Sequence, residues 1–119
     1  PTVITAQEAK EKYHGKPDVV FIDNRPDPDF CAGHIPGAVN LTYFAPDTPG
    51  NRLTAEALKA FAGKKLVFYC KGVLRAKNAV EAARSWGIDP KLLFWFKDGF
   101  PAWQKQGYPV EKMDDACPI

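Results

Sequence analysis

Residues 66–75 read Leu-Val-Phe-Tyr-Cys-Lys-Gly-Val-Leu-Arg, and this stretch decides the fold. Its first four residues form a continuous apolar run, which is typical of a β-strand that is covered on both faces. A tight loop containing Gly72 follows, and residues 76–86 then repeat small and apolar side chains at helical spacing. The sequence therefore predicts a strand, a tight loop and a helix in direct succession, with Cys70 at the first junction.

The same type of strand occurs on both sides of this stretch. Val19–Ile22 and Leu92–Phe96 are continuous apolar runs, and Ala38–Leu41 has the composition of a short strand. The first run ends at the polar segment Asp23–Pro26, and a segment rich in Pro, Asp and Gly, which we expect to be a loop, extends to Gly37. Polar residues thus gather where buried strands end.

Helix signals separate these strands. Thr5–Glu8 forms a capping box that predicts a helix to about Tyr13, and Thr54 predicts a second helix through about Phe61. Gly87 is expected to end the helix after Cys70, and Lys97–Gly99 to turn into a short helix that ends near Gly107.

Alternating strands and helices predict an α/β fold, with a mostly parallel central sheet of about five strands and helices on both faces. The chain has 119 residues, so we expect a single domain over residues 1–119. Parallel sheets place ligand sites at the carboxyl ends of their strands, where Asp23 and Cys70 are found.

Composition excludes several classes of protein. With 16 basic and 14 acidic residues the net charge is only +2, which argues against a nucleic acid or a membrane surface as the main partner. No apolar run is long enough to span a bilayer and no signal peptide opens the chain, although Pro1 in place of Met indicates that residues have been removed. We expect a monomer that acts on a small anion.

Cys70 has the surroundings of an activated thiol. A cysteine between a buried strand and a helix lies near the positive end of the helix dipole, where a thiolate is stabilised. The backbone N–H groups of Lys71–Arg75 are able to curl around the sulfur, and the side chains of Lys71 and Arg75 add positive charge. This pattern predicts a lowered pKa and a nucleophile that attacks an anion, whereas Cys70 alone would be read as a small core residue.

Three segments resemble the rhodanese family, and together they cover nearly the whole chain. Phe21–Arg25 followed by Gly33–Ala38 is similar to the family's Asp-x-Arg and Gly-His-Ile-Pro-Gly-Ala signature. Tyr69–Ala76 is similar to its active-site loop, in which a cysteine begins a six-residue ring that commonly ends in arginine. Asp98–Trp103 and Gly107–Val110 resemble its Gly-Gly-x-x-Ala-Trp and Gly-x-Pro-Val ending, with Asp98 replacing the first glycine.

The resemblance implies a sulfurtransferase that carries sulfur on Cys70 as a persulfide and needs no metal or organic cofactor. The donor would be thiosulfate or a similar small sulfur-containing anion, and the acceptor would be cyanide, a thiol or a carrier protein. The substrate-binding residues would be Lys71, Gly72, Val73, Leu74 and Arg75 of the loop, with Arg25 at the pocket rim. Because Gly72 stands one position early and Val73 and Leu74 are bulky, a donor other than thiosulfate remains open.

Other polar and aromatic residues have two readings each. Asp23 is either an acid at the pocket edge or an acceptor that organises its loop. His34 is either a base or, as its Gly-His-Ile-Pro-Gly context favours, a residue that ties a loop by hydrogen bonds. Trp95 is either a core residue or one that reaches the pocket.

Two other functions stay open. Some phosphatases and arsenate reductases use a cysteine and an arginine, but they resemble the pattern Cys-x5-Arg, whereas four residues separate Cys70 from Arg75. A rhodanese-like domain can also hold sulfur for a partner or act as a regulatory module with little turnover.

Cys31 and Cys117 are expected not to be catalytic, because neither lies at a strand-to-helix junction or beside basic residues. Any disulfide should therefore exclude Cys70, while the sequence leaves open whether the other two pair. The family resemblance is strongest to exported bacterial proteins, which favours the periplasm over the cytoplasm.

Overall fold

The computed structural model describes residues 1–113 and Cys117. Its strands are β1 (Thr2–Ile4), β2 (Val19–Asp23), β3 (Val39–Asn40), β4 (Lys65–Tyr69) and β5 (Leu93–Phe96). Its helices are α1 (Ala6–Glu8), α2 (Asp27–Ala32), α3 (Ala55–Leu58), α4 (Val73–Ser85) and α5 (Gly99–Lys105), with single helical turns η1 (Ala9–Tyr13), η2 (Lys59–Phe61) and η3 (Pro90–Leu92).

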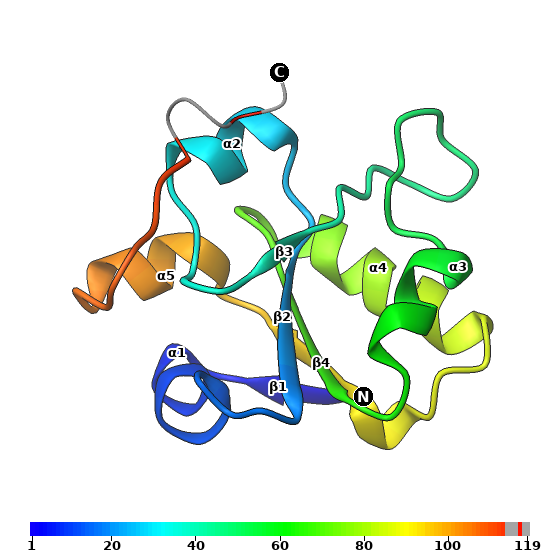
Figure 1. Ribbon diagram of the computed structural model, residues 1–119, viewed down its shortest axis with the longest axis horizontal. Coiled ribbons are helices and arrows are strands. Elements are labelled where there is room, and N and C mark those ends of the chain that lie inside the picture. Colours follow the sequence, from blue (N-terminus) through cyan, green and yellow to red (C-terminus); the bar gives the residue numbers. More distant parts are fainter. Residues whose placement is uncertain (114–116, 118–119) are drawn as a thin grey trace.

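Across the described part of the chain the strands form one five-stranded sheet in the order β1-β5-β4-β2-β3, and every pair is parallel. Helices α3 and α4 cover one face and α1 and α5 cover the other (Figure 1). The predicted α/β fold, with a parallel sheet between two layers of helices, is confirmed.

Strand β4 shows why the sheet is covered on both faces. Phe68 packs into the cluster beneath α3 and α4, while Val67 and Tyr69 pack into the cluster beneath α1 and α5. Alternate side chains of one strand thus enter two separate cores. Cys70, one residue beyond the strand, belongs to the core on the α4 side.

Local signals account for the helix ends. The capping box is formed as predicted, because the Glu8 N–H donates to Thr5 Oγ1 at 3.1 Å and the Thr5 N–H donates to Glu8 Oε1 at 3.0 Å. Thr54 caps α3 through the Ala57 N–H. Gly87, with a φ of 92°, follows the end of α4 as expected.

The structure differs from the predicted local structure at three places. The segment expected as a loop from Pro26 to Gly37 contains α2, which begins after Pro26 and buries Phe30 and Cys31. Strand β1, which pairs with β5 at the sheet edge, was not predicted. Helix α4 begins at Val73, so the second half of the presumed loop is the first helical turn.

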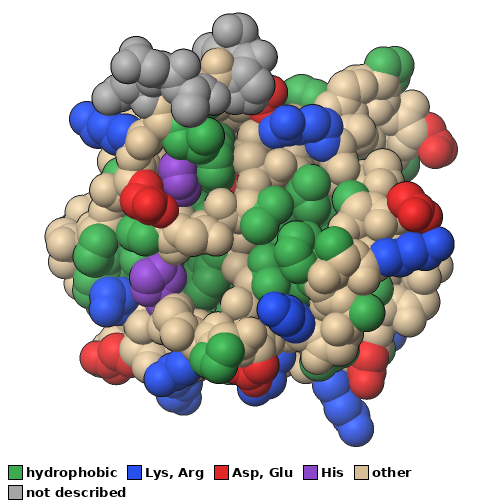
Figure 2. All heavy atoms as spheres, viewed as in Figure 1, with side chains coloured by type: hydrophobic (Ala, Val, Ile, Leu, Met, Phe, Trp, Pro, Cys, Tyr) green, Lys and Arg blue, Asp and Glu red, His purple; other side chains and the backbone are tan. Residues whose placement is uncertain are grey.

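On the face that Figure 2 shows, the charged side chains lie mainly around the edge and are not separated by sign. Basic and acidic side chains alternate around the face shown in Figure 2. No helix within the described ranges is long and apolar enough to cross a membrane.

Candidate active site

Cys70 lies where β4 ends and α4 is about to begin. Its side chain is only 2% exposed. The Ala76 N–H donates to Cys70 Sγ at 3.4 Å, and the Gly72 carbonyl oxygen also contacts the sulfur. The first turn of a 13-residue helix therefore faces the thiol.

The expected lowering of the Cys70 pKa is not found. Burial raises the pKa of the thiol, and the Ala76 N–H, the Gly72 contact and the charge of Arg75 offset only part of this effect. The loop does not supply the expected ring of donors either, because Gly72 turns its carbonyl oxygen toward the sulfur. Desolvation disfavours the thiolate more than the helix terminus stabilises it.

An open pocket of about 690 Å³ gives access to this region. From the predicted site it brings together Cys70, Lys71, Gly72, Leu74 and Arg75. The side chain of Lys71 is exposed, whereas that of Arg75 is partly buried. The pocket thus joins a buried thiol to two basic groups at its mouth; the side chain of Val73 lies outside the described structure.

Three walls of this pocket come from residues that the sequence did not identify as part of the site. Phe44 belongs to the loop after β3, Asn78 to the second turn of α4, and Asp29 to α2. The Arg75 guanidinium carbon lies 5.5 Å from the centre of the Phe44 ring. Nothing in the local sequence around these residues marks them, since only the folded chain brings them to Cys70.

Arg25 was expected at the pocket rim, but only 4% of its surface is exposed and it does not line the pocket at Cys70. It lines a smaller hollow that shares Lys71 and Asp29 with that pocket. Arg25 Nη2 lies 2.7 Å from Asp23 Oδ2 and 2.6 Å from the Gly33 carbonyl oxygen. Its guanidinium also lies 4.3 Å from the centre of the Phe100 ring. Because its guanidinium already makes these contacts, Arg25 is not free to bind the substrate as the sequence had predicted.

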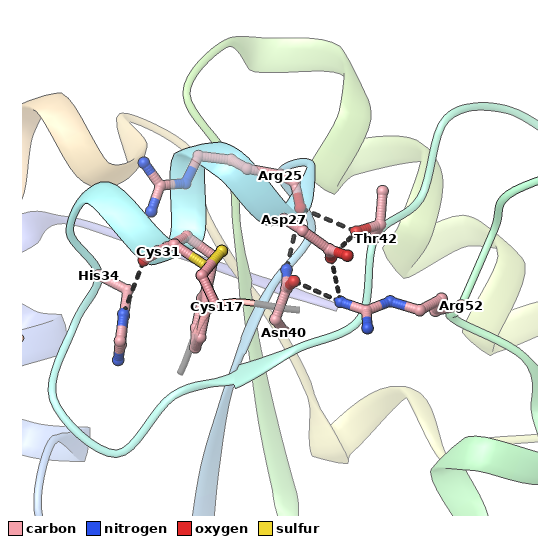
Figure 3. The surroundings of a disulfide bond; sticks show 9 residues. Arg25, Asp27, Cys31, His34, Asn40, Thr42, Arg52 and Cys117 are labelled. Atoms are coloured by element: carbon pink, nitrogen blue, oxygen red, sulfur yellow. Dashed lines mark hydrogen bonds and ion pairs between the residues drawn. A yellow bond between two sulfur atoms is a disulfide. The ribbon is translucent and has the colours of Figure 1, made fainter. Parts of the chain in front are cut away.

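Asp23 organises its loop. Its carboxylate accepts the Arg25 backbone N–H at 2.9 Å and is fully buried. The carbonyl oxygen of Arg25 in turn accepts bonds from Asn40 and Thr42, which fixes the chain after β3 (Figure 3). Of its two readings, the structure supports that of the loop-organising acceptor.

His34 ties a loop in place, as its sequence context favoured. Its ring stacks on Phe30 with the ring centres 3.7 Å apart, and Nδ1 lies 2.9 Å from the Phe30 carbonyl oxygen. Its backbone exchanges two hydrogen bonds of 2.9 Å with Glu111. His34 thus joins α2 to the C-terminal segment.

Trp95 packs in the core rather than at the site. It is partly buried against the cluster on the α4 side, and Lys97 Nζ lies 5.9 Å from its ring. It is not part of the wall of the pocket at Cys70.

Cys31 and Cys117 form a disulfide, with their Cα atoms 5.6 Å apart (Figure 3). The Met113 N–H donates to the Cys31 carbonyl oxygen at 3.0 Å, so a backbone hydrogen bond also joins the C-terminal segment to α2. Cys70 is a free thiol. The prediction that any disulfide excludes Cys70 is confirmed.

Within residues 1–113 and Cys117, no group of three or more His, Cys, Asp or Glu side chains is placed to hold a metal ion.

Comparison with known proteins agrees with this fold. Residues 5–106 match the family described as the Rhodanese-like domain. The chain is 33% identical over 104 residues to an HTH-type transcriptional regulator of Mycobacterium tuberculosis, covering 86% of this chain and 40% of the regulator. It is 28% identical over 114 residues to an uncharacterized protein of Synechocystis, covering 96% of this chain and 59% of that protein. The chain thus spans about half the length of these relatives.

Solved structures show the same architecture. A Rhodopseudomonas palustris protein of unknown function, described as a possible tyrosine phosphatase, is 30% identical with a TM-score of 0.67, covering 92% of this chain and 84% of that one. The Rhodanese-like domain of an Anabaena protein is 21% identical with a TM-score of 0.73, covering 100% and 86%. SseA of Escherichia coli, a 3-mercaptopyruvate sulfotransferase, is 22% identical with a TM-score of 0.70, covering 94% and 52%.

The last two likenesses concern the fold alone, but the family match extends over most of the sequence and includes the strand, loop and helix around Cys70. The chain therefore belongs to the rhodanese-like domain family.

Proposed function

We propose that the protein is a sulfurtransferase that takes sulfane sulfur from thiosulfate or a similar anion and passes it to a nucleophile. The Cys70 thiolate attacks the outer sulfur of thiosulfate. A new bond forms between the two sulfurs, the bond between the outer sulfur and the sulfonate group breaks, and sulfite leaves with the electron pair. Cys70 is left as a persulfide.

The observation that carries this proposal is the position of the Cys70 thiol at the N-terminal end of α4, beside a pocket that also contains Lys71 and Arg75. A persulfide would add one sulfur atom at this point and move the negative charge toward the pocket. The first N–H groups of α4 and the two basic side chains would stabilise that charge and the departing sulfite.

In the second step an acceptor thiolate or cyanide attacks the terminal sulfur of the protonated persulfide. The bond between that sulfur and Cys70 Sγ breaks, and its electron pair restores the Cys70 thiolate. Neither step needs a metal or an organic cofactor. In each step the nucleophile supplies the electron pair of the new bond, and the pair of the broken sulfur–sulfur bond leaves with the departing group.

Mass spectrometry after exposure to thiosulfate, followed by a cyanide turnover assay, tests the proposal. The protein should gain the mass of one sulfur and lose it on addition of cyanide, with formation of thiocyanate. Cys70→Ser should keep its fold and gain no sulfur, because a serine hydroxyl does not accept sulfane sulfur. Turnover that survives in this variant would refute the mechanism.

One observation favours a carrier or regulatory module instead. Burial raises the Cys70 pKa, so little thiolate is present at neutral pH. A sulfur carrier needs a stable persulfide rather than fast turnover. A protein that gains one sulfur but forms thiocyanate only over hours would have this second function.

The description of the Rhodopseudomonas palustris relative as a possible tyrosine phosphatase makes phosphate ester hydrolysis the other alternative. The four-residue gap between Cys70 and Arg75 argues against it, since the phosphatase pattern has five. Hydrolysis of p-nitrophenyl phosphate that depends on Cys70, without uptake of sulfur, would establish it.

We further propose that the protein works in the periplasm. Disulfides such as Cys31–Cys117 persist in oxidising compartments and are rare in the cytosol. Thiol trapping of the protein in its own cells should find Cys31 and Cys117 blocked and Cys70 reactive. If all three cysteines react without prior reduction, the compartment is reducing.

A further inference from the structure

A second hollow adjoins the pocket at Cys70. It has a volume of about 770 Å³ and lies between α4 and the chain from Tyr43 to Ala55, which ends at the first residue of α3. Asn78 lines both hollows, and the same loop walls both, through Phe44 on one side and Tyr43 on the other. We call the two hollows together the α4 groove.

The dimensions of the α4 groove suit a short extended peptide. Along α4 its wall includes Leu74, Asn78 and Ser85. At 1.5 Å per residue, the distance from Leu74 to Ser85 along the helix is about 16 Å. An extended chain rises about 3.3 Å per residue, so roughly five residues would fill this length.

Charge changes sign along the α4 groove. At the Cys70 end the basic Lys71 and Arg75 outnumber the acidic Asp29, whereas the charged residues that line the second hollow are the acidic Asp47 and Glu81. The rise along α4 from Arg75 to Glu81 is about 9 Å, which corresponds to about three residues of an extended peptide.

Among the described residues, the two carboxylates in the second hollow, those of Asp47 and Glu81, have no hydrogen-bond or ion-pair partner. Three other exposed carboxylates, those of Glu8, Asp18 and Glu56, each lie within 4 Å of a lysine ammonium group. The second hollow therefore offers two negative charges to a positively charged ligand.

Apolar side chains also point out along this side of the protein. Leu74 is 66% exposed and Phe44 is 41% exposed at the Cys70 end, and Trp86 is 38% exposed at the far end. A peptide would cover these side chains and remove apolar surface from water.

The loop wall is held in shape without a ligand. Asn51 Oδ1 accepts the Phe44 N–H at 2.8 Å, and Asn51 Nδ2 donates to the Ala45 carbonyl oxygen at 2.7 Å. A preformed groove avoids part of the ordering cost that binding would otherwise carry.

We infer that the α4 groove binds the sulfur acceptor, and that this acceptor is an extended peptide segment of a partner protein with a basic residue about three positions from its cysteine. The inference rests on the proposed function. The acceptor thiolate would attack the terminal sulfur of the protonated Cys70 persulfide, Cys70 would leave as a thiolate, and the peptide cysteine would become the persulfide. The basic residue would meanwhile lie between Asp47 and Glu81.

Binding is tested first, without chemistry. Four capped, fluorescently labelled pentapeptides carry Ser in place of the acceptor cysteine and either Lys or Glu three residues away, each in both chain directions. Fluorescence anisotropy at low salt should show that the Lys peptide in one direction binds several-fold more tightly than its Glu counterpart. The preference should shrink as salt is added. Equal affinities overturn the inference whether or not Cys70 ever forms a persulfide.

Charge reversal then locates the binding site. Glu81→Gln should lower the affinity for the Lys peptide by roughly two- to fivefold, the range for one exposed ion pair. Glu81→Lys should abolish the preference, because the introduced ammonium group offsets the charge of the remaining Asp47 carboxylate. Glu11→Lys, an exposed position in η1 on the opposite face of the sheet, is the matched control and should change nothing. A preference for the Lys peptide that survives undiminished in Glu81→Lys overturns the site.

Sulfur transfer completes the test. With the Cys70 persulfide formed beforehand, the Lys peptide that carries a cysteine should accept sulfur with a lower KM than the Glu peptide, and Glu81→Gln should reduce this difference. Failure to form the persulfide refutes the proposed function, and the Ser peptides still report on the groove. Cysteamine, a small cationic thiol, should have a higher KM than the Lys peptide, and an equal KM overturns the peptide acceptor.

Discussion

Gly99 lies directly against the carbonyl oxygen of Cys70, so closely that a Cβ atom on Gly99 would overlap that oxygen. Gly99 also has a φ of 67°, and the N–H of its neighbour Phe100 donates to the same carbonyl oxygen at 3.0 Å. The turn from β5 into α5 thus packs against the backbone of Cys70 and holds its carbonyl oxygen by a hydrogen bond. The glycine is required both for its conformation and for its lack of a side chain.

Gly99→Ala should therefore destabilise the protein by roughly 2 to 4 kcal/mol, from the positive φ and the forced displacement of Cys70. Gly107→Ala is the matched control, since Gly107 has a φ of 74° but open space around its Cα atom. Urea denaturation measures both variants. If the two lose the same free energy of unfolding, the contact with Cys70 contributes nothing.

Arg75→Ala should impair the donor step more than the acceptor step. Only the donor step binds an anion and releases sulfite, and a lost hydrogen bond to a charged group lowers the donor kcat/KM roughly ten- to hundredfold. Stopped-flow measurements with thiosulfate and with cyanide separate the two steps. Lys77→Ala, on the same helix but outside the Cys70 pocket, should leave both rates unchanged. Equal losses in the two steps would contradict this role for Arg75.

Persulfide formation should accelerate with pH well into the alkaline range. Burial raises the Cys70 pKa, and only the thiolate attacks the donor, so the rate should still be rising at pH ~8.5, where an ordinary cysteine is half ionised. The unfolded chain releases this proton first, so the free energy of unfolding should also fall above that pH. Circular dichroism shows whether the protein stays folded. A rate that is constant from pH 6 to 8 would mean that the pKa is low instead.

Replacing Cys31 and Cys117 together with Ser should lower stability while sparing the chemistry. The disulfide closes a loop with a sequence separation of 86, for which chain entropy predicts a loss of roughly 4 to 5 kcal/mol. Thermal and urea denaturation measure the loss, and sulfur uptake from thiosulfate measures the chemistry. If the double variant remains folded but takes up no sulfur, one of these cysteines relays sulfur and the single-cysteine mechanism fails.

Buried strands and the helix after Cys70 could be predicted from the sequence because their signals are local. A run such as Leu66–Tyr69 has too few polar residues for any exposed face, and α4 repeats small residues at helical spacing. Strand β1 was missed since three residues at a sheet edge show no periodicity. Helix α2 was missed because Pro28 and two aspartates in its first turn resemble a loop, although Phe30 anchors it in the core.

The site was predictable only in part, for a related reason. Cys70, Lys71 and Arg75 are close in sequence, so their meeting in one pocket follows from the loop itself. Phe44 and Asp29 reach the pocket only through the fold. The Cys70 pKa depends on burial, which is a tertiary property, and the sequence revealed only the opposing effect of the helix terminus. Arg25 was misplaced because its ion pair with Asp23 draws it beneath the surface.

The Cys31–Cys117 disulfide also determines how the protein would respond to mechanical force. Tension applied through the two ends of the chain would cross from residue 31 to residue 117 through the sulfur bridge, and the 86-residue interval would carry none of it. Of the described elements, β1, α1, η1, β2 and most of α2 lie on the loaded side, so they would peel away first. In a single-molecule stretching experiment, Cys70 and its pocket would stay inside a covalent ring that lengthens only after the disulfide is reduced.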